Sequence, residues 1–242
     1  MRRWLGGRRL ALLGVMLAAG GCAPGSGAPA AGARASQSST GWREAFPVAK
    51  AGLVSAGRNP FFILEPGYRL VYRHGQATLT ITVLDETRLV DGVETRVVEE
   101  REESGGQLSE VSRNYYALDK ATGDVYYFGE DVDSYKAGKV VGHGEAWLSG
   151  VNGAKFGLMM PGQPKVGDRY YQEVAPKTAM DRAEVVSLAE TLKVPAGTFA
   201  KCLCTAESSA LEGGTGRKWY APGVGLVKDD EFELVRVEPA GK

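Results

Sequence analysis

The alternation of apolar and polar residues predicts β-strands along most of the chain. Thr78-Leu-Thr-Ile-Thr-Val-Leu84 alternates Thr with apolar side chains, which is the two-residue period of a half-buried strand. Asp91-Gly92 follows it and predicts a hairpin turn, because both residues tolerate a positive φ. Residues 115–128 predict another pair of strands around a turn at 119–123. Only residues 45–56, with Pro47 near their start, fit one short helix.

Landmarks of one half of the chain return in the same order in the other half. They pair Pro66-Gly67 with Val166-Gly167, Glu86-Thr87 with Glu190-Thr191, Tyr115-Tyr-Ala117 with Trp219-Tyr-Ala221, and Gly123-Asp-Val125 with Gly225-Leu-Val227. The repetition predicts a single antiparallel all-β domain of two duplicated β-meanders over residues 42–242. Repeat 1 is expected at about 63–128, a connecting segment at 129–160 and repeat 2 at about 163–238. A barrel, a half-barrel and a sandwich all fit this spacing.

The first residues carry an export signal. Met1 to Arg9 contains four arginines and no acid, and residues 10–19 are almost purely apolar. A basic start, a short apolar run and small residues before a cut are typical of a signal peptide, predicted at residues 1–21. The apolar run is shorter than the roughly 20 residues that a membrane-spanning helix needs.

Ala19-Gly-Gly-Cys22 resembles the lipobox of bacterial membrane lipoproteins, although Ala19 stands where that motif usually has Leu. The resemblance implies that the Cys22 thiol receives a diacylglyceryl group, that the signal is cut just before it, and that the new amino terminus is acylated with a fatty acid such as palmitate. Attached acyl chains would hold the protein on a membrane. The alternative is an ordinary secreted protein that is cut elsewhere.

Residues 22–41 are expected to form the lipid anchor and a disordered tether, because Ala, Gly, Ser and Pro dominate Ala23 to Thr40. The predicted location is the cell envelope, with membrane lipid as partner through acylated Cys22. In a cell with two membranes we expect the outer one, because Ala23 rather than an aspartate follows the cysteine. In a cell with one membrane we expect its outer face.

Charge argues against nucleic acid as a partner. Lys plus Arg and Asp plus Glu number 29 each, and four of the arginines lie in the signal, so the mature chain is mildly acidic. Cys202 and Cys204 lie two apart on a predicted strand and face the same side. We interpret them as small apolar core residues rather than as a metal or redox pair.

The chain shows no familiar catalytic pattern. It has no Gly-x-Ser-x-Gly elbow, phosphate loop or dinucleotide fingerprint. His74 and His143 have no partners at the spacing of a metal site. Residues 130–133, Glu-Asp-Val-Asp, lack the ligand ladder of a calcium loop and are interpreted as a solvated acidic turn. We therefore expect no catalytic residue, no metal and no cofactor, and a protein that is not an enzyme.

Segment 147–161 mixes glycines with large apolar residues and joins the two repeats. One interpretation is a plug that covers an end of the core. The other is a lid or portal on an apolar pocket, since Met and aromatic side chains suit apolar ligands. The candidate pocket residues are Trp147, Phe156, Met159 and Met160.

Three turn and strand landmarks, at residues 59–67, 164–168 and 220–227, resemble a bacterial family of uncharacterised secreted proteins over about residues 59–237. The resemblance implies an exported all-β domain and no particular activity. The first functional hypothesis is an envelope lipoprotein with a non-enzymatic domain that binds a partner protein or supports envelope structure. A carrier or sensor of an apolar small molecule or lipid is the alternative, and an unfamiliar hydrolase is the second alternative. A hollow interior favours the carrier, and a solid core with an exposed aromatic patch favours the partner-binding protein.

Overall fold

The computed structural model describes residues 41–144 and 146–241, which are nearly all β-strand. The predicted signal peptide, Cys22 and the tether lie outside this part of the chain. A three-residue 3-10 turn, η1 (Lys50–Gly52), precedes the strands. The strands are β1 (Leu53–Val54), β2 (Gly57–Asn59), β3 (Phe62–Leu64), β4 (Arg69–His74), β5 (Ala77–Val90), β6 (Val93–Ser104), β7 (Gln107–Asp119), β8 (Val125–Lys136), β9 (Lys139–His143), β10 (Trp147–Leu148), β11 (Lys155–Met160), β12 (Arg169–Tyr171), β13 (Glu173–Val174), β14 (Asp181–Val194), β15 (Gly197–Ser209), β16 (Gly216–Ala221), β17 (Gly225–Asp229) and β18 (Phe232–Glu238).

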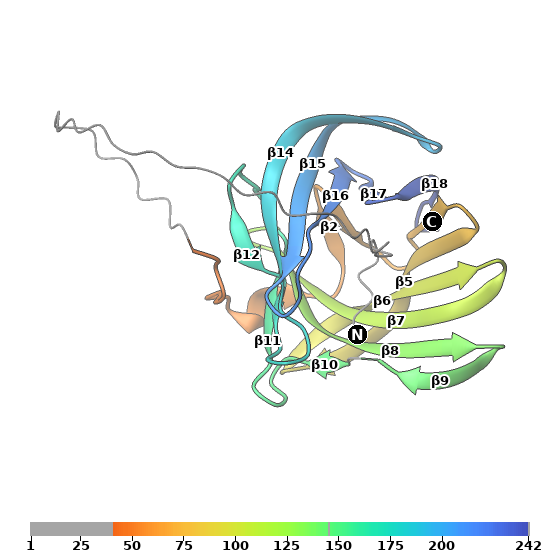
Figure 1. The fold of residues 1–242 in the computed structure, drawn as a ribbon. Coiled ribbons are helices and arrows are strands. Elements are labelled where there is room, and N and C mark those ends of the chain that lie inside the picture. The colour runs from red at the N-terminus through yellow and green to blue at the C-terminus, as the bar shows by residue number, and fades with distance from the viewer. Residues whose placement is uncertain (1–40, 145, 242) are drawn as a thin grey trace, which may run out of the picture.

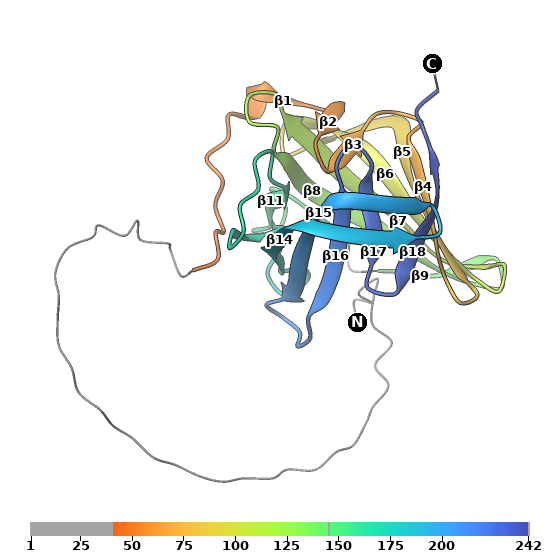
Figure 2. The same cartoon turned by 90° about the horizontal axis from the view of Figure 1, so that it is seen from above.

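One antiparallel sheet winds through both halves of the chain in the order β12-β14-β15-β16-β17-β18-β4-β5-β6-β7-β8-β11-β13. Its two end strands, β12 and β13, are separated in the chain by Gln172 alone. The sheet therefore returns to its own start and forms a nearly closed barrel (Figure 1). The predicted all-β domain is confirmed, and among the three architectures that fitted the sequence the structure is the barrel. Figure 2 shows the same strands from above.

Both halves of the sheet use the same backbone pattern. The amide of Gly67 donates to the carbonyl of Val83 at 2.8 Å, and Gly167 donates to Val185 at the same distance. In each half the valine amide returns a hydrogen bond of 2.9 Å to the residue after the glycine. β5 and β14 follow these turns and each has 14 residues. The hairpin predicted at Asp91-Gly92 joins β5 to β6, with φ of 50° and 77°.

The barrel encloses a core rich in tyrosine as well as in aliphatic residues. Tyr72, Phe128, Leu158 and Leu234 are fully buried. Tyr116 stacks on Tyr127 with ring centroids 4.9 Å apart. Because alternate residues of a strand point to opposite faces, each long strand sends every second side chain into this interior. Tyrosine brings hydroxyl groups with it, so the interior is not uniformly apolar.

Two expectations about local structure are wrong. Residues 45–56 hold only the 3-10 turn η1 and the strand β1, because Leu53 and Val54 pair with β7. Residues 130–133 are not a turn: they lie within β8, where Glu130 pairs with Asn114 and is buried. Long-range strand pairing satisfies the backbone in both places and overrides the local signal.

The segment between the repeats forms part of the barrel wall. β10 and β11 both pair with β8, and β11 also pairs with β13. The expectation that residues 147–161 form a connecting loop is therefore wrong. Within the described ranges no helix is long and apolar enough to cross a membrane.

The start of the described chain is attached to the strand at one end of the sheet. Arg43 donates its amide to the carbonyl of Arg169 at 3.1 Å and accepts from the amide of Tyr171 at 2.9 Å. The guanidinium of Arg182 lies over the Trp42 ring, 4.7 Å from its centroid. These contacts cover the free edge of β12.

We expect Gly157→Ala to destabilise the barrel. A Cβ at Gly157 would lie 2.4 Å from the carbonyl carbon and oxygen of Gln172, so the backbone of β11 or of the β12–β13 segment would have to move. The cost should be roughly 1–3 kcal/mol of unfolding free energy, seen as a Tm lower by several degrees in a thermal melt followed by circular dichroism. Gly142→Ala is the control, because nothing lies within 4 Å of its Cβ position. Equal melting of the two variants would contradict the tight contact.

Candidate functional site

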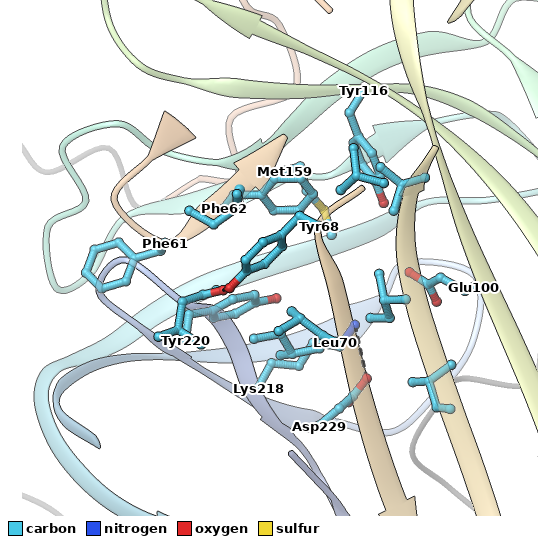
Figure 3. A pocket seen from close by; sticks show the side chains of 18 residues that line it. Phe61, Phe62, Tyr68, Leu70, Glu100, Tyr116, Met159, Lys218, Tyr220 and Asp229 are labelled. Carbon is cyan, nitrogen blue, oxygen red and sulfur yellow. Dashed lines mark hydrogen bonds and ion pairs between the residues drawn. The ribbon is translucent and has the colours of Figure 1, made fainter. Parts of the chain in front are cut away.

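The barrel contains a pocket that is partly open to solvent (Figure 3). Its wall is mainly apolar. Among the residues that line it are Phe61, Phe62, Ile63, Tyr68, Leu70, Leu79, Ile81, Val83, Val98, Glu100, Tyr116, Met159, Lys218, Tyr220, Leu226 and Asp229. Most of these residues lie on β3 to β7 and on β16 and β17, so both repeats contribute to one pocket.

Strand alternation places the apolar wall. Leu79, Ile81 and Val83 are every second residue of β5 and all line the pocket, while the threonines between them point to the opposite face. Phe62 packs edge-on against Tyr116, with ring centroids 5.1 Å apart. The alternating apolar residues that predicted this strand thus also form the hydrophobic side of the pocket.

An ionic group lies at one side of the pocket (Figure 3). Lys218 of β16 lies directly opposite Asp229 of β17 in the sheet, and its Nζ is 3.6 Å from the Asp229 carboxylate. The same Nζ is 3.3 Å from the carboxylate of Glu207 on β15. Both carboxylates are almost completely buried. A buried charge is tolerated when it is paired and hydrogen-bonded, and Lys218 provides the pairing for both.

Glu207 has several further partners. Its Oε1 accepts hydrogen bonds from the Thr205 hydroxyl at 3.0 Å, the Tyr220 hydroxyl at 3.4 Å and the Gln172 amide at 3.4 Å. A buried carboxylate with this many donors is held in one position. Glu207 therefore fixes Lys218, and Lys218 in turn faces the pocket.

Burial shifts the titration of the acidic groups that line the pocket. Desolvation raises the pKa of Asp229 to about 7, although Lys218 opposes the shift. Desolvation also raises the pKa of Glu100 to about 7, with Lys218 opposing it and Glu130 and Glu110 adding to it. Glu100 keeps part of its surface accessible, but it lines the pocket within the barrel. Burial opposes the charge of Lys218, yet Asp229 and Glu207 outweigh it and raise its pKa.

Two polar groups of the pocket have no partner within the described part of the chain. No hydrogen bond reaches the Tyr116 hydroxyl, although its side chain is only 3% exposed. No hydrogen bond or ion pair there reaches the carboxylate of Glu100. Burial, and next the nearby Glu100, raise the pKa of Tyr116 well above its usual value, so its hydroxyl stays protonated. Both groups line the pocket, so a ligand that enters it can supply their hydrogen-bond partners.

The structure does not bring the four candidate pocket residues together in one site. Met159 lines the pocket described above. Trp147 lines a different, solvent-open pocket beside Leu148 and Ala154. Phe156 stacks on Phe128, with ring centroids 4.7 Å apart.

Met160 is fully buried in the core. Segment 147–161 is part of the wall rather than a lid, because its strands are hydrogen-bonded into the sheet.

The other residues considered for chemistry lie away from the pocket. Cys202 and Cys204 are free and almost fully buried, and burial raises the pKa of each thiol. His74 contacts Glu231 at 3.1 Å, and His143 contacts Asp133 at 2.7 Å, both at the exposed surface. No group of three or more His, Cys, Asp and Glu residues within 41–144 and 146–241 is placed to hold a metal ion.

Sequence reasoning missed Glu100, Lys218 and Asp229. Glu100 lies in the run Glu99-Glu-Arg-Glu-Glu103, and Lys218 follows Arg217, so both resemble ordinary surface charges. Their positions in the strand could have shown this. Lys218 lies two residues before Tyr220 on one strand, so its side chain points to the same face as this buried tyrosine.

Neither a known protein-family model nor a curated protein sequence matches the chain. The resemblance of its turn landmarks to a family of secreted proteins is therefore not supported by a family match. Among solved structures, a provisionally assigned lipoprotein from Parabacteroides distasonis is similar with 13% identity and a TM-score of 0.35. The match covers 72% of this chain and 95% of that one. Similarity at this level carries no argument about fold or function.

We expect Glu100→Gln to stabilise the protein at about pH 8 and to have little effect at about pH 5. The folded pKa of Glu100 is raised to about 7, so the folded state binds the proton more tightly than the unfolded state. Stability from this group is therefore present at low pH and is lost as pH rises toward and through 7. Glutamine removes the charge, and the gain at high pH should be on the order of 2 kcal/mol.

Thermal melts at the two pH values measure this difference. Glu99→Gln is the control, because Glu99 lies on the other face of β6 and pairs with Arg113. The same Tm shift for Glu100→Gln at both pH values would contradict the raised pKa.

Proposed function

We propose that this chain is an exported, membrane-anchored lipoprotein whose β domain binds a small apolar molecule inside its barrel and does not catalyse a reaction. The observation that carries the proposal is the pocket itself. It is lined mainly by apolar side chains from both repeats, and two polar groups that line it, the Tyr116 hydroxyl and the Glu100 carboxylate, have no hydrogen-bond partner in the described part of the protein. Pockets of this kind, mainly apolar with a few convergent polar groups, are typical of small-molecule sites.

The surface favours a carrier over a protein-binding module. The large apolar side chains exposed within the described ranges are all aliphatic: Leu89, Val140, Val141, Val151, Val166 and Leu211. An exposed aromatic patch, which the partner-binding hypothesis requires, is not among them. A partner-binding or structural role in the envelope remains the second candidate, because Val140 and Val141 are exposed on β9, a strand that pairs on one side only.

The anchor is proposed from the sequence. Cys22 lies outside the described residues, and Ala19-Gly-Gly-Cys22 supports its lipidation through the resemblance to a lipobox. An apolar ligand suits such a location, because a protein held at a membrane works beside a reservoir of apolar molecules.

Mass spectrometry of the protein purified from membranes tests binding. We expect a small apolar molecule at close to one per chain. Ile81→Phe adds volume inside the pocket and should lower the occupancy at least about fivefold, because overfilling a pocket excludes its ligand. Thr80→Phe adds the same ring to the other face of β5 and should leave occupancy unchanged. Equal occupancy in both variants would show that the molecule binds elsewhere, and an empty wild-type protein would contradict the carrier function.

Replacement of Cys22 tests the anchor independently. Cys22→Ser removes the thiol that accepts the diacylglyceryl group, and a hydroxyl is a far weaker nucleophile at neutral pH. We expect an uncut precursor that does not incorporate labelled fatty acid, whereas the wild-type protein does and partitions into detergent. Normal cleavage of the variant at the same position, together with a soluble wild-type protein, would support simple secretion instead.

A further inference from the structure

The polar part of the pocket carries more acid than base. Glu100 and Asp229 line it, and Glu207 lies just behind Lys218. Lys218 is the one cation among the lining residues. Three carboxyl groups thus face one ammonium group, and two of them, Asp229 and Glu207, are the partners of that ammonium.

Glu100 is the one of these three carboxyl groups that forms no ion pair with Lys218, so it is available to a ligand. It lies on β6, two strand positions along from Val98, and both side chains line the pocket. Tyr116 of β7 points into the same space, and both polar groups end inside the pocket in Figure 3. The negative charge of Glu100 is, after burial, the largest cause of the raised pKa of Tyr116.

The ring of Tyr116 is held in place. It packs against Phe62 on one side and stacks on Tyr127 on the other, with centroid distances of 5.1 and 4.9 Å. The hydroxyl at its tip can accept a hydrogen bond and can also donate one to a carboxylate. A fixed hydroxyl and a carboxylate that line the same pocket can both accept hydrogen bonds from a ligand group that carries several N–H donors.

We infer that the ligand is a lipophilic amine, with an apolar body against Leu79, Ile81 and Val83 and a cationic nitrogen between Glu100 and Tyr116. An ammonium group donates to the carboxylate and to the hydroxyl oxygen, and both partners then have the hydrogen bonds that they lack. A ligand carboxylate would face Glu100 and Asp229 and would find Lys218 already paired. A neutral alcohol would fill the same space without the charge-assisted bond.

The raised pKa of Glu100, about 7, fits this role. An ionised Glu100 is costly here chiefly because burial desolvates it; Lys218 offsets part of that cost, and Glu130 and Glu110 add to it. A bound ammonium supplies the missing opposite charge. Binding of the amine should therefore lower the pKa of Glu100.

The inference rests on the proposed function and is tested with three ligands that have the same apolar adamantane cage and differ only in their polar group. Adamantylamine, adamantanol and adamantane carboxylate are titrated by calorimetry at about pH 8 into the full-length protein in lipid nanodiscs, with empty nanodiscs subtracted. We expect adamantylamine to bind at least about tenfold more tightly than the other two. Glu100→Gln should remove this preference, and Tyr116→Phe, which deletes only the hydroxyl, should weaken amine binding by about threefold or more.

Glu99→Gln, on the opposite face of the same strand, is the matched control and should leave all three affinities unchanged. Equal binding of adamantanol and adamantylamine, or an unchanged amine preference in a folded Glu100→Gln protein, would overturn the amine inference while leaving the carrier function in place. Tighter binding of the carboxylate would also overturn it. If none of the three ligands binds, and the protein purified from membranes is also empty, the carrier function and this inference both fail.

Discussion

Closure of the sheet at Gln172 is the constraint on which the rest of the structure depends. β12 and β13 flank this residue and form the two ends of the sheet, so one short segment belongs to both sides of the seam. Gly157 allows β11 to approach the Gln172 backbone more closely than a residue with a Cβ could. The side chain of Gln172 reaches Glu207, which fixes Lys218 at the pocket. Closing the barrel and ordering its polar interior are therefore linked through one residue.

The interior balances two opposing demands. Apolar side chains from the long strands supply the hydrophobic burial that stabilises a domain of this size. Charged groups among them lose solvation, and Lys218 forms ion pairs with Glu207 and Asp229 and offsets only part of this cost for Glu100. Sites that bind ligands commonly retain such unfavourable groups, because a ligand can satisfy what the protein leaves unsatisfied. Glu100 and Tyr116 fit this description.

Local sequence signals predicted the elements that local chemistry decides. The alternation at 78–84 and the Asp91-Gly92 turn predicted β5 and its hairpin, because side-chain period and positive φ are properties of short segments. The wall strands β10 and β11 were missed, since they have only two and six residues and β11 is irregular in register between Leu158 and Met160. The pocket was missed for a different reason: its polar groups come from strands far apart in the chain. Only the sheet order brings them together, and that order depends on long-range closure.

The contact between Arg43 and β12 gives the proposed membrane attachment a mechanical meaning. Two backbone hydrogen bonds join Arg43 to β12, and this strand is the one beside the seam. A load applied from the amino-terminal side of Arg43 reaches β12 before any other strand of the sheet. β12 has only three residues, so tension would be resisted by very few bonds. Tension on the chain from its amino-terminal side would thus act first next to Gln172, the residue whose side chain contacts Glu207 at the pocket.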